Sequence, residues 1–323
     1  MTELPFNLAL VRFLADHRSE PLTALFSFFT FLGELEGYIL LVVLVYVAFD
    51  KRLGVRLALV TLVAMSLNHV LKTLIANPRP FVVEGDYLAR WAVSPAKAAE
   101  LATEFSTPSG HAMAGAAFYT ALYDGLRTRR AAIVCALVAL LIGLSRPYLG
   151  VHYLEDVLLG WPLGAALAWL LLRDAEGIGA RWARLSLAAQ AIALGTASVL
   201  FCLATRALGA WRGDPHPTAF VSYAGLLSGV LLGARLEAEH VCFDPKSGGA
   251  LRKGLRYALA LGLVIGVLAG LKTAFAAIAE NTTPTGDALR WLRYAAAGAM
   301  GVFVAPLVCM RLGLAEREPP RGS

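Results

Sequence analysis

A histidine and an aspartate stand four residues apart in the stretch SRPYLGVHYLED, which covers residues 145–156. They are His152 and Asp156, and a spacing of four places two side chains on the same face of a helix. The carboxylate of Asp156 can then hold one imidazole nitrogen and leave the other free to attack an electrophile. The pattern therefore predicts a nucleophilic histidine oriented by a carboxylate.

Three cations, Lys72, Arg79 and Arg146, lie at the ends of apolar stretches. An isolated charge at membrane depth costs several kcal/mol, so it normally faces a wet cavity or a partner. The arginine fork matches two phosphate oxygens, and lysine adds a point charge. These cations predict a site for a phosphoryl group and for the extra charge of its transition state. Asn68, one turn before Lys72, either orients that lysine or forms an interhelical hydrogen bond.

The stretch TPSGH supplies a second histidine together with a helix start. Thr107 is the expected cap, and Pro108 fits the first turn. The backbone amides of Ser109 and Gly110 would then lie at the positive end of the helix, which favours an anion. His111 lies in the first turn and is expected to face the same cavity.

The elements that must position these residues are membrane-spanning helices. Of the 323 residues, 58% are hydrophobic and 16% are charged, whereas soluble proteins carry roughly 25% charged residues. Apolar runs of about 18 or more residues predict spanning helices, because only closed backbone structures are stable in lipid. The predicted fold class is all-α, a polytopic membrane helix bundle. Its roughly nine spans are expected at residues 30–49, 54–76, 110–126, 130–145, 152–172, 185–208, 217–236, 254–279 and 288–312.

The remaining segments complete the expected organisation. Residues 4–17 predict a short amphipathic helix in the membrane interface. Residues 77–108 carry Pro78, Pro80 and Pro95 and are of mixed polarity, which predicts a loop or partial lid. The polar stretch 315–323 predicts a disordered tail. We expect a catalytic core over residues 1–180 and additional spans over residues 181–314.

The basic residues indicate how the chain is oriented. Lysine and arginine gather in alternate loops, which predicts that those loops are cytoplasmic. The net charge of +6 therefore reflects orientation in a membrane and does not indicate nucleic acid binding. All three motif segments fall on the opposite side, although the hydropathy argument does not require it. The four cysteines are widely spaced and predict neither a disulfide nor a metal site.

Taken together, the motifs resemble those of the type 2 phosphatidic acid phosphatase family. They are Lys-x6-Arg-Pro starting at Lys72, Pro-Ser-Gly-His ending at His111, and Ser-Arg-x5-His-x3-Asp ending at Asp156, in the family's spacing and order. The resemblance implies a six-span phosphatase core that uses no metal and no other cofactor. The extra carboxyl-terminal spans resemble the sphingosine-phosphate phosphatase and glucose-6-phosphatase branches, whereas Asp156 favours the lipid-phosphatase side.

The resemblance also implies a role for each motif residue. His152 attacks phosphorus and forms a phosphohistidine, while Asp156 orients it. His111 protonates the leaving oxygen and later activates water. The residues implied to bind phosphate are Lys72, Arg79, Ser109, Gly110 and Arg146.

The leading hypothesis is hydrolysis of a lipid phosphate: a sphingoid phosphate, phosphatidate, lysophosphatidate or a polyprenyl diphosphate. The alternatives are phosphotransfer to a lipid acceptor, a sugar-phosphate phosphatase, or a transporter or scaffold on an inactive core. The abundant arginine and alanine suggest a bacterium. Because the motifs fall on the side with few basic residues, the expected location is the inner membrane with the site facing the periplasm. The expected partners are the membrane and a phospholipid or lipid-phosphate substrate, and the oligomeric state stays open.

Overall fold

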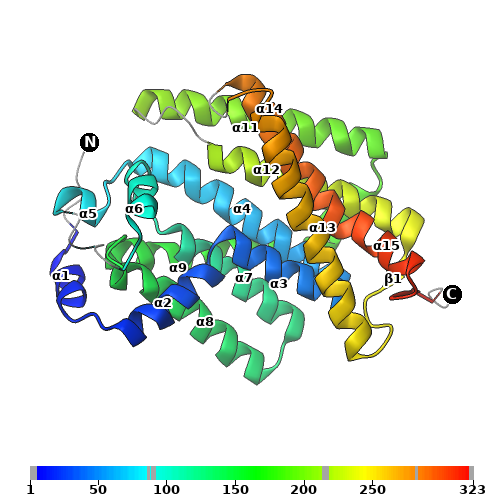
Figure 1. The fold of residues 1–323 in the computed structure, drawn as a ribbon, viewed down its shortest axis with the longest axis horizontal. Helices are drawn as coiled ribbons and strands as arrows, with labels where there is room; N and C mark the ends of the chain where they lie inside the picture. Colours follow the sequence, from blue (N-terminus) through cyan, green and yellow to red (C-terminus); the bar gives the residue numbers. More distant parts are fainter. Residues whose placement is uncertain (1–5, 86–87, 89–91, 213–217, 281–282, 320–323) are drawn as a thin grey trace. The chain divides into compact units, whose positions relative to one another are not determined.

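The protein is built almost entirely of helices (Figure 1). The computed structural model describes residues 6–85, 88, 92–212, 218–280 and 283–319. The helices fold into two compact units. The first unit comprises Met1–Tyr38, Val63–Arg173 and Thr205–Pro215, and the second comprises Ile39–Leu62, Asp174–Ala204 and His216–Ser323. All the predicted site residues belong to the first unit.

The first unit is a bundle around helix α7 (Gly110–Leu126). This helix packs against α8 (Arg129–Tyr148) and α9 (Leu154–Leu172), and α8 also contacts α1 and α2. The other helices of this unit are α1 (Ala9–Asp16), α2 (Glu20–Leu32), α5 (Pro80–Val83), α6 (Pro95–Ala102) and the carboxyl-terminal half of α4 (Lys51–Ile75).

Two glycines on α9 allow it to lie close to α7. A side chain at Gly160 would collide with the Ser109 carbonyl, and one at Gly164 would collide with the Met113 carbonyl. Small residues permit such close backbone approach between membrane helices. The start of α9, which carries the predicted nucleophile and its aspartate, is therefore held beside the start of α7.

The second unit has a core between α12 (Thr218–Leu236) and α14 (Pro284–Ala299). Gly225, Gly229 and Gly233 lie one turn apart on α12 and face the backbone of α14. The unit also contains α3 (Leu35–Ala48, from Ile39 on), α10 (Ala175–Ala183), α11 (Leu187–Arg212, up to Ala204), α13 (Ala250–Ala276) and α15 (Ala305–Arg311), together with the π-helical turns η2 (Glu237–Val241) and η3 (Met300–Val304).

The structure confirms an all-α, polytopic membrane protein but not the predicted count of nine spans. Within the described residues, seven helices are long and apolar enough to cross a membrane, or eight if the bent pair α2–α3 forms one span. The predicted span 110–126 is α7, which has only 17 residues. The predicted first span, 30–49, starts too late: α2 begins at Glu20, and α2 and α3 meet at an angle of 63°. The chain bends at Gly33, which ends α2.

Two other predicted segments differ from expectation. The amphipathic helix expected at residues 4–17 is the shorter α1, and it buries Val11 among Phe81, Leu101 and Tyr148 instead of presenting only a surface face. The loop expected at 77–108 contains α5 and α6 in its described part. Both of these short helices begin with proline in the first turn, where its missing N–H costs no helix hydrogen bond.

The carboxyl-terminal stretch is more ordered than the sequence predicts. Strand β2 (Glu316–Arg317) pairs antiparallel with β1 (Phe243–Asp244). Lys51 also pairs with Glu318 at 3.0 Å. These backbone hydrogen bonds and this ion pair hold residues 316–318 in place, although their polar composition predicted a disordered tail. Residues 320–323 of that tail lie outside the described part of the chain.

Candidate active site

His152 and Asp156 form a buried pair at the start of α9. His152 lies in the turn before the helix, and Asp156 is its third residue. Nδ1 of His152 donates to the Asp156 carboxylate at 3.0 Å, and the two side chains are 1% and 0% exposed. With the proton on Nδ1, the other ring nitrogen, Nε2, carries the lone pair.

Four donors surround the Asp156 carboxylate. Besides His152, the hydroxyls of Ser106 and Thr107 donate to it at 2.5 Å each, and the Tyr153 backbone N–H donates at 2.9 Å. A buried carboxylate is stable only when hydrogen bonds replace its lost hydration. This shell fixes the orientation of the carboxylate, and with it the tautomer of the imidazole.

Arg79 lies on the other side of the imidazole. One of its nitrogens, Nη1, donates to Nε2 of His152 at 3.0 Å and to the Val151 carbonyl at 3.0 Å. The guanidinium is 1% exposed. The predicted nucleophilic atom therefore faces a cation that could bind a phosphate oxygen.

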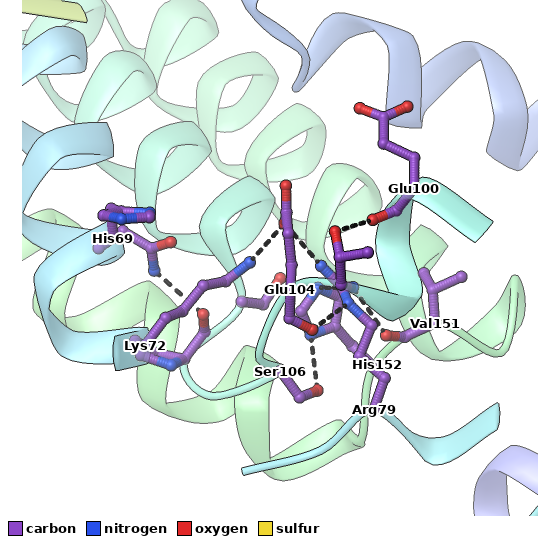
Figure 2. A network of polar contacts seen from close by, with 12 residues as sticks. His69, Lys72, Arg79, Glu100, Glu104, Ser106, Val151 and His152 are labelled. Carbon is purple, nitrogen blue, oxygen red and sulfur yellow. Dashed lines mark hydrogen bonds and ion pairs between the residues drawn. The ribbon is translucent and has the colours of Figure 1, made fainter. Parts of the chain in front are cut away.

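Lys72 and Arg79 converge on one carboxylate, that of Glu104 (Figure 2). One oxygen of Glu104 lies 3.3 Å from Nζ of Lys72 and 3.0 Å from Nη2 of Arg79. The partial loss of hydration of the half-exposed Glu104 would raise its pKa, but the charges of Lys72 and Arg79 outweigh this effect and lower that pKa to about 2. An anion thus already occupies the position between the two cations.

The surroundings of His152 keep its imidazole neutral. Burial is the main cause, and the positive charges of Arg79 and Lys72 add to it, so that the pKa of His152 falls well below the usual histidine value. Both effects disfavour the charged imidazolium. A neutral imidazole is the form that can act as a nucleophile.

The start of α7 differs from the predicted anion site. The cap is Ser109, whose hydroxyl accepts from the Ala112 N–H at 3.4 Å, and not Thr107, whose hydroxyl is bound to Asp156. The Ser109 backbone N–H donates to the Asp156 carbonyl at 3.0 Å and is therefore engaged. The space at Gly110 is taken by the Asn68 side chain.

Asn68 forms a hydrogen bond from helix α4 to a loop. Its amide donates at 3.0 Å to the carbonyl of Pro108 in the turn before α7, so the bond does not join two helices as expected. This bond fixes α4 against the turn before α7.

His111 and Arg146 carry unmet hydrogen-bonding capacity. Within the described residues, neither Nε2 of His111 nor Nε of Arg146 has a hydrogen-bond partner, although both atoms are buried. Arg146 donates through Nη1 to the Thr30 hydroxyl at 3.2 Å. A buried polar atom without a partner needs an explanation, and a ligand bound at this place would supply one.

The side chains of this site differ from a typical set of metal ligands. In the part of the chain that the structure describes, no three histidine, cysteine, aspartate or glutamate side chains converge as metal ligands. The charges that face the nucleophile belong to Lys72 and Arg79.

The comparisons with known proteins place these residues in a family. Residues 53–178 match the family described as PAP2 superfamily, and they contain every predicted site residue. The chain carries a PAP2 superfamily domain. Residues 221–317 match the PAP2 superfamily phosphatase, transmembrane extension.

Individual relatives cover only parts of the chain. Phosphatidylglycerophosphatase B of Bacillus subtilis is 36% identical over 78 residues, which is 21% of this chain and 38% of that protein. Human glucose-6-phosphatase 3 is 27% identical over 258 residues, 67% of this chain and 71% of that protein. A crystal structure of a PAP2-type phosphatidylglycerolphosphate phosphatase from Bacillus subtilis has a TM-score of 0.44 and 28% identity, and the match covers 53% of this chain and 84% of that one. The match to phosphatidylglycerophosphatase B covers 38% of that protein, so this chain spans well under half of its length.

The PAP2 domain contains three site residues that the sequence did not single out as such. Glu104 bridges the two cations, and Ser106 and Thr107 bind Asp156. One signal was available, because Glu104, Ser106 and Thr107 are polar residues directly before the PSGH motif. Their spacing alone, however, does not reveal which distant side chain each would meet.

Proposed function

We propose that this chain is a membrane-embedded phosphatase that hydrolyses a lipid phosphate monoester through a phosphohistidine at His152. The proposed setting is a bacterial inner membrane with the site open to the periplasm. The observation that carries the proposal is the orientation of His152. Asp156 holds Nδ1 at 3.0 Å, while Nε2 points at the Arg79 guanidinium at 3.0 Å.

In the first step, the lone pair on Nε2 of His152 attacks phosphorus, and the bond from phosphorus to the leaving oxygen breaks. His111 gives a proton to that oxygen, which departs as an alcohol. Asp156 stabilises the positive charge that develops on the imidazole. The phosphoryl oxygens bind Lys72 and Arg79 in place of the contacts these cations now make.

In the second step, water attacks the phosphohistidine on the side that the alcohol has left. His111 takes the proton of that water, and the bond between phosphorus and Nε2 breaks. Inorganic phosphate is released, and His152 regains its starting form. Arg146, the Ser109 hydroxyl and the Gly110 amide are the further proposed phosphate ligands, and no step requires a metal ion.

The substrate class is inferred from the membrane setting and from the names of the relatives. Phosphatidylglycerophosphatase B acts, by its name, on a phospholipid phosphate. Candidates for this chain are a sphingoid phosphate, phosphatidate, lysophosphatidate or a polyprenyl diphosphate. A sugar-phosphate phosphatase is the second candidate, because the human glucose-6-phosphatase relative covers 67% of this chain.

The test is phosphate release by the purified protein, measured over a panel of lipid and sugar phosphates. We expect His152→Ala to abolish release, whereas His240→Ala, an exposed histidine of the second unit, should retain it. We expect His111→Ala to lower release strongly, because both steps need His111 to move a proton. Wild-type release by His152→Ala would refute the proposal. Phosphate transferred to a lipid acceptor would identify a phosphotransferase, and substrate flux without turnover would identify a transporter.

A further inference from the structure

A cavity of about 240 Å³ adjoins the reaction centre within the first unit. Its lining includes Thr30, Glu34, Ser94, Lys97, Arg146 and Val151. Pockets for drug-sized ligands measure roughly 300–1,000 Å³. The cavity therefore has room for a small group and not for the two acyl chains of a phospholipid.

The cavity lies on the side of the proposed acid. Gly33, between the lining residues Phe31 and Glu34, packs so closely on His111 that a side chain at Gly33 would stand 2.9 Å from the imidazole. Val151 directly precedes His152, and Arg146, whose Nε has no hydrogen-bond partner among the described residues, lines the wall. An alcohol that receives its proton from His111 would leave into this space.

Glu34 gives the cavity an acceptor. A carboxylate accepts hydrogen bonds and donates none when it is ionised. The lysine in the same wall, Lys97, is paired with Glu100 at 3.1 Å. Arg146, one of the proposed phosphate ligands, lines the same cavity. The cavity thus offers a hydrogen-bond acceptor, Glu34, beside one of the phosphate cations.

We propose that Glu34 is a specificity-determining residue that binds a hydroxyl or ammonium group on the leaving alcohol. This inference rests on the proposed phosphatase function and narrows its substrates. Phosphomonoesters of polyols and amino alcohols carry such donors, either on a lipid, as in lysophosphatidate and sphingoid phosphates, or as free glycerol phosphate. Phosphatidate has its hydroxyls acylated, and the leaving group of a polyprenyl diphosphate carries neither a hydroxyl nor an ammonium group on its hydrocarbon chain.

The test compares kcat/KM for two matched substrate pairs. The lipid pair is lysophosphatidate and phosphatidate, and the free pair is glycerol 3-phosphate and propyl phosphate. We expect Glu34→Ala, which removes the acceptor, to lower kcat/KM about tenfold for the hydroxylated member and to leave the other member within about twofold. The pair that responds identifies whether the donor belongs to a lipid or to a free phosphate. Glu36→Ala is the control, because Glu36 is exposed two residues away.

Equal losses for both members of each pair, or no loss for either, would overturn the role of Glu34. Those results leave the phosphatase proposal intact, because His152→Ala must still abolish all release. If the wild-type protein hydrolyses no phosphate in the panel, the proposed function fails and this inference fails with it.

Discussion

Glu104 lies between the two cations of the site, with one carboxylate oxygen 3.0 Å from Nη2 of Arg79 and 3.3 Å from Nζ of Lys72. Its side chain is 46% exposed, whereas that of Arg79 is 1% exposed. The carboxylate therefore approaches the cations from the solvent side. A substrate phosphoryl group that binds the same cations must displace it or share them with it.

Replacing Glu104 should consequently tighten phosphate binding. We expect Glu104→Gln to lower the inhibition constant of inorganic phosphate by about fivefold, the equivalent of one partly exposed ion pair. Glu100→Gln is the matched control, because Glu100 is exposed and pairs with Lys97 instead. Weaker phosphate inhibition in Glu104→Gln would mean that Glu104 holds the cations in place for the substrate.

Asp156 should affect turnover more than binding. Asp156→Asn would remove the negative charge beside Nδ1–H of His152 and could present an NH2 donor to Nδ1 instead. The proton would then move to Nε2, and the imidazole would lose the lone pair that attacks phosphorus. We expect kcat to fall by about a hundredfold to ten-thousandfold, while the inhibition constant of inorganic phosphate stays within about threefold. Glu155→Gln, one residue away, should leave both values unchanged. A loss confined to phosphate binding would contradict a positioning role.

The sequence predicts the pairing of His152 with Asp156 well because it depends on spacing within one short segment. The contacts of Glu104, Ser106 and Thr107 depend on how the turn before α7 meets α4 and α9, and local patterns carry no such information. Ser109 shows the same limit. Its motif predicted a free backbone amide, but the packing of α9 brings the Asp156 carbonyl to that amide at 3.0 Å.

The number of membrane spans is likewise only partly predictable from local sequence patterns. Apolar runs identify the membrane helices, but α2 and α3 form a bent pair because of the turn at Gly33, within a stretch that hydropathy reads as the start of one span. The bend has a consequence for the site. It brings Gly33 against His111 and makes Glu34 part of the cavity wall.

The pH dependence of turnover should reflect the neutral His152. Because burial and the nearby cations lower the pKa of His152, its imidazole stays unprotonated as the pH falls through the ordinary value of about 6.5. The acid limb of kcat/KM should therefore lie below pH 6.5, after correction for the substrate phosphate, whose second pKa is about 6. An acid limb that remains above 6.5 after this correction would show that His152 does not keep a lowered pKa in the working enzyme.

Chelation of divalent metals should leave turnover unchanged. Lys72 and Arg79 already place two positive charges at the proposed phosphate position, and they can neutralise the charge that a metal ion would otherwise bind. The measurement is phosphate release before and after dialysis against EDTA. Loss of turnover that magnesium restores, and that sodium does not, would contradict this prediction.

The glycines of α12 should matter for stability and not for the chemistry. A side chain at Gly229 would collide with the Ala295 carbonyl on α14, whereas Gly266 on α13 has open space around it. Overpacking costs about 1–3 kcal/mol, so Gly229→Leu should lower the Tm of the purified protein by about 5 °C, and Gly266→Leu should not. Activity per folded molecule should persist in both variants, because the site residues belong to the other unit. Equal Tm values for the two variants would show that α12 and α14 do not pack through this glycine face.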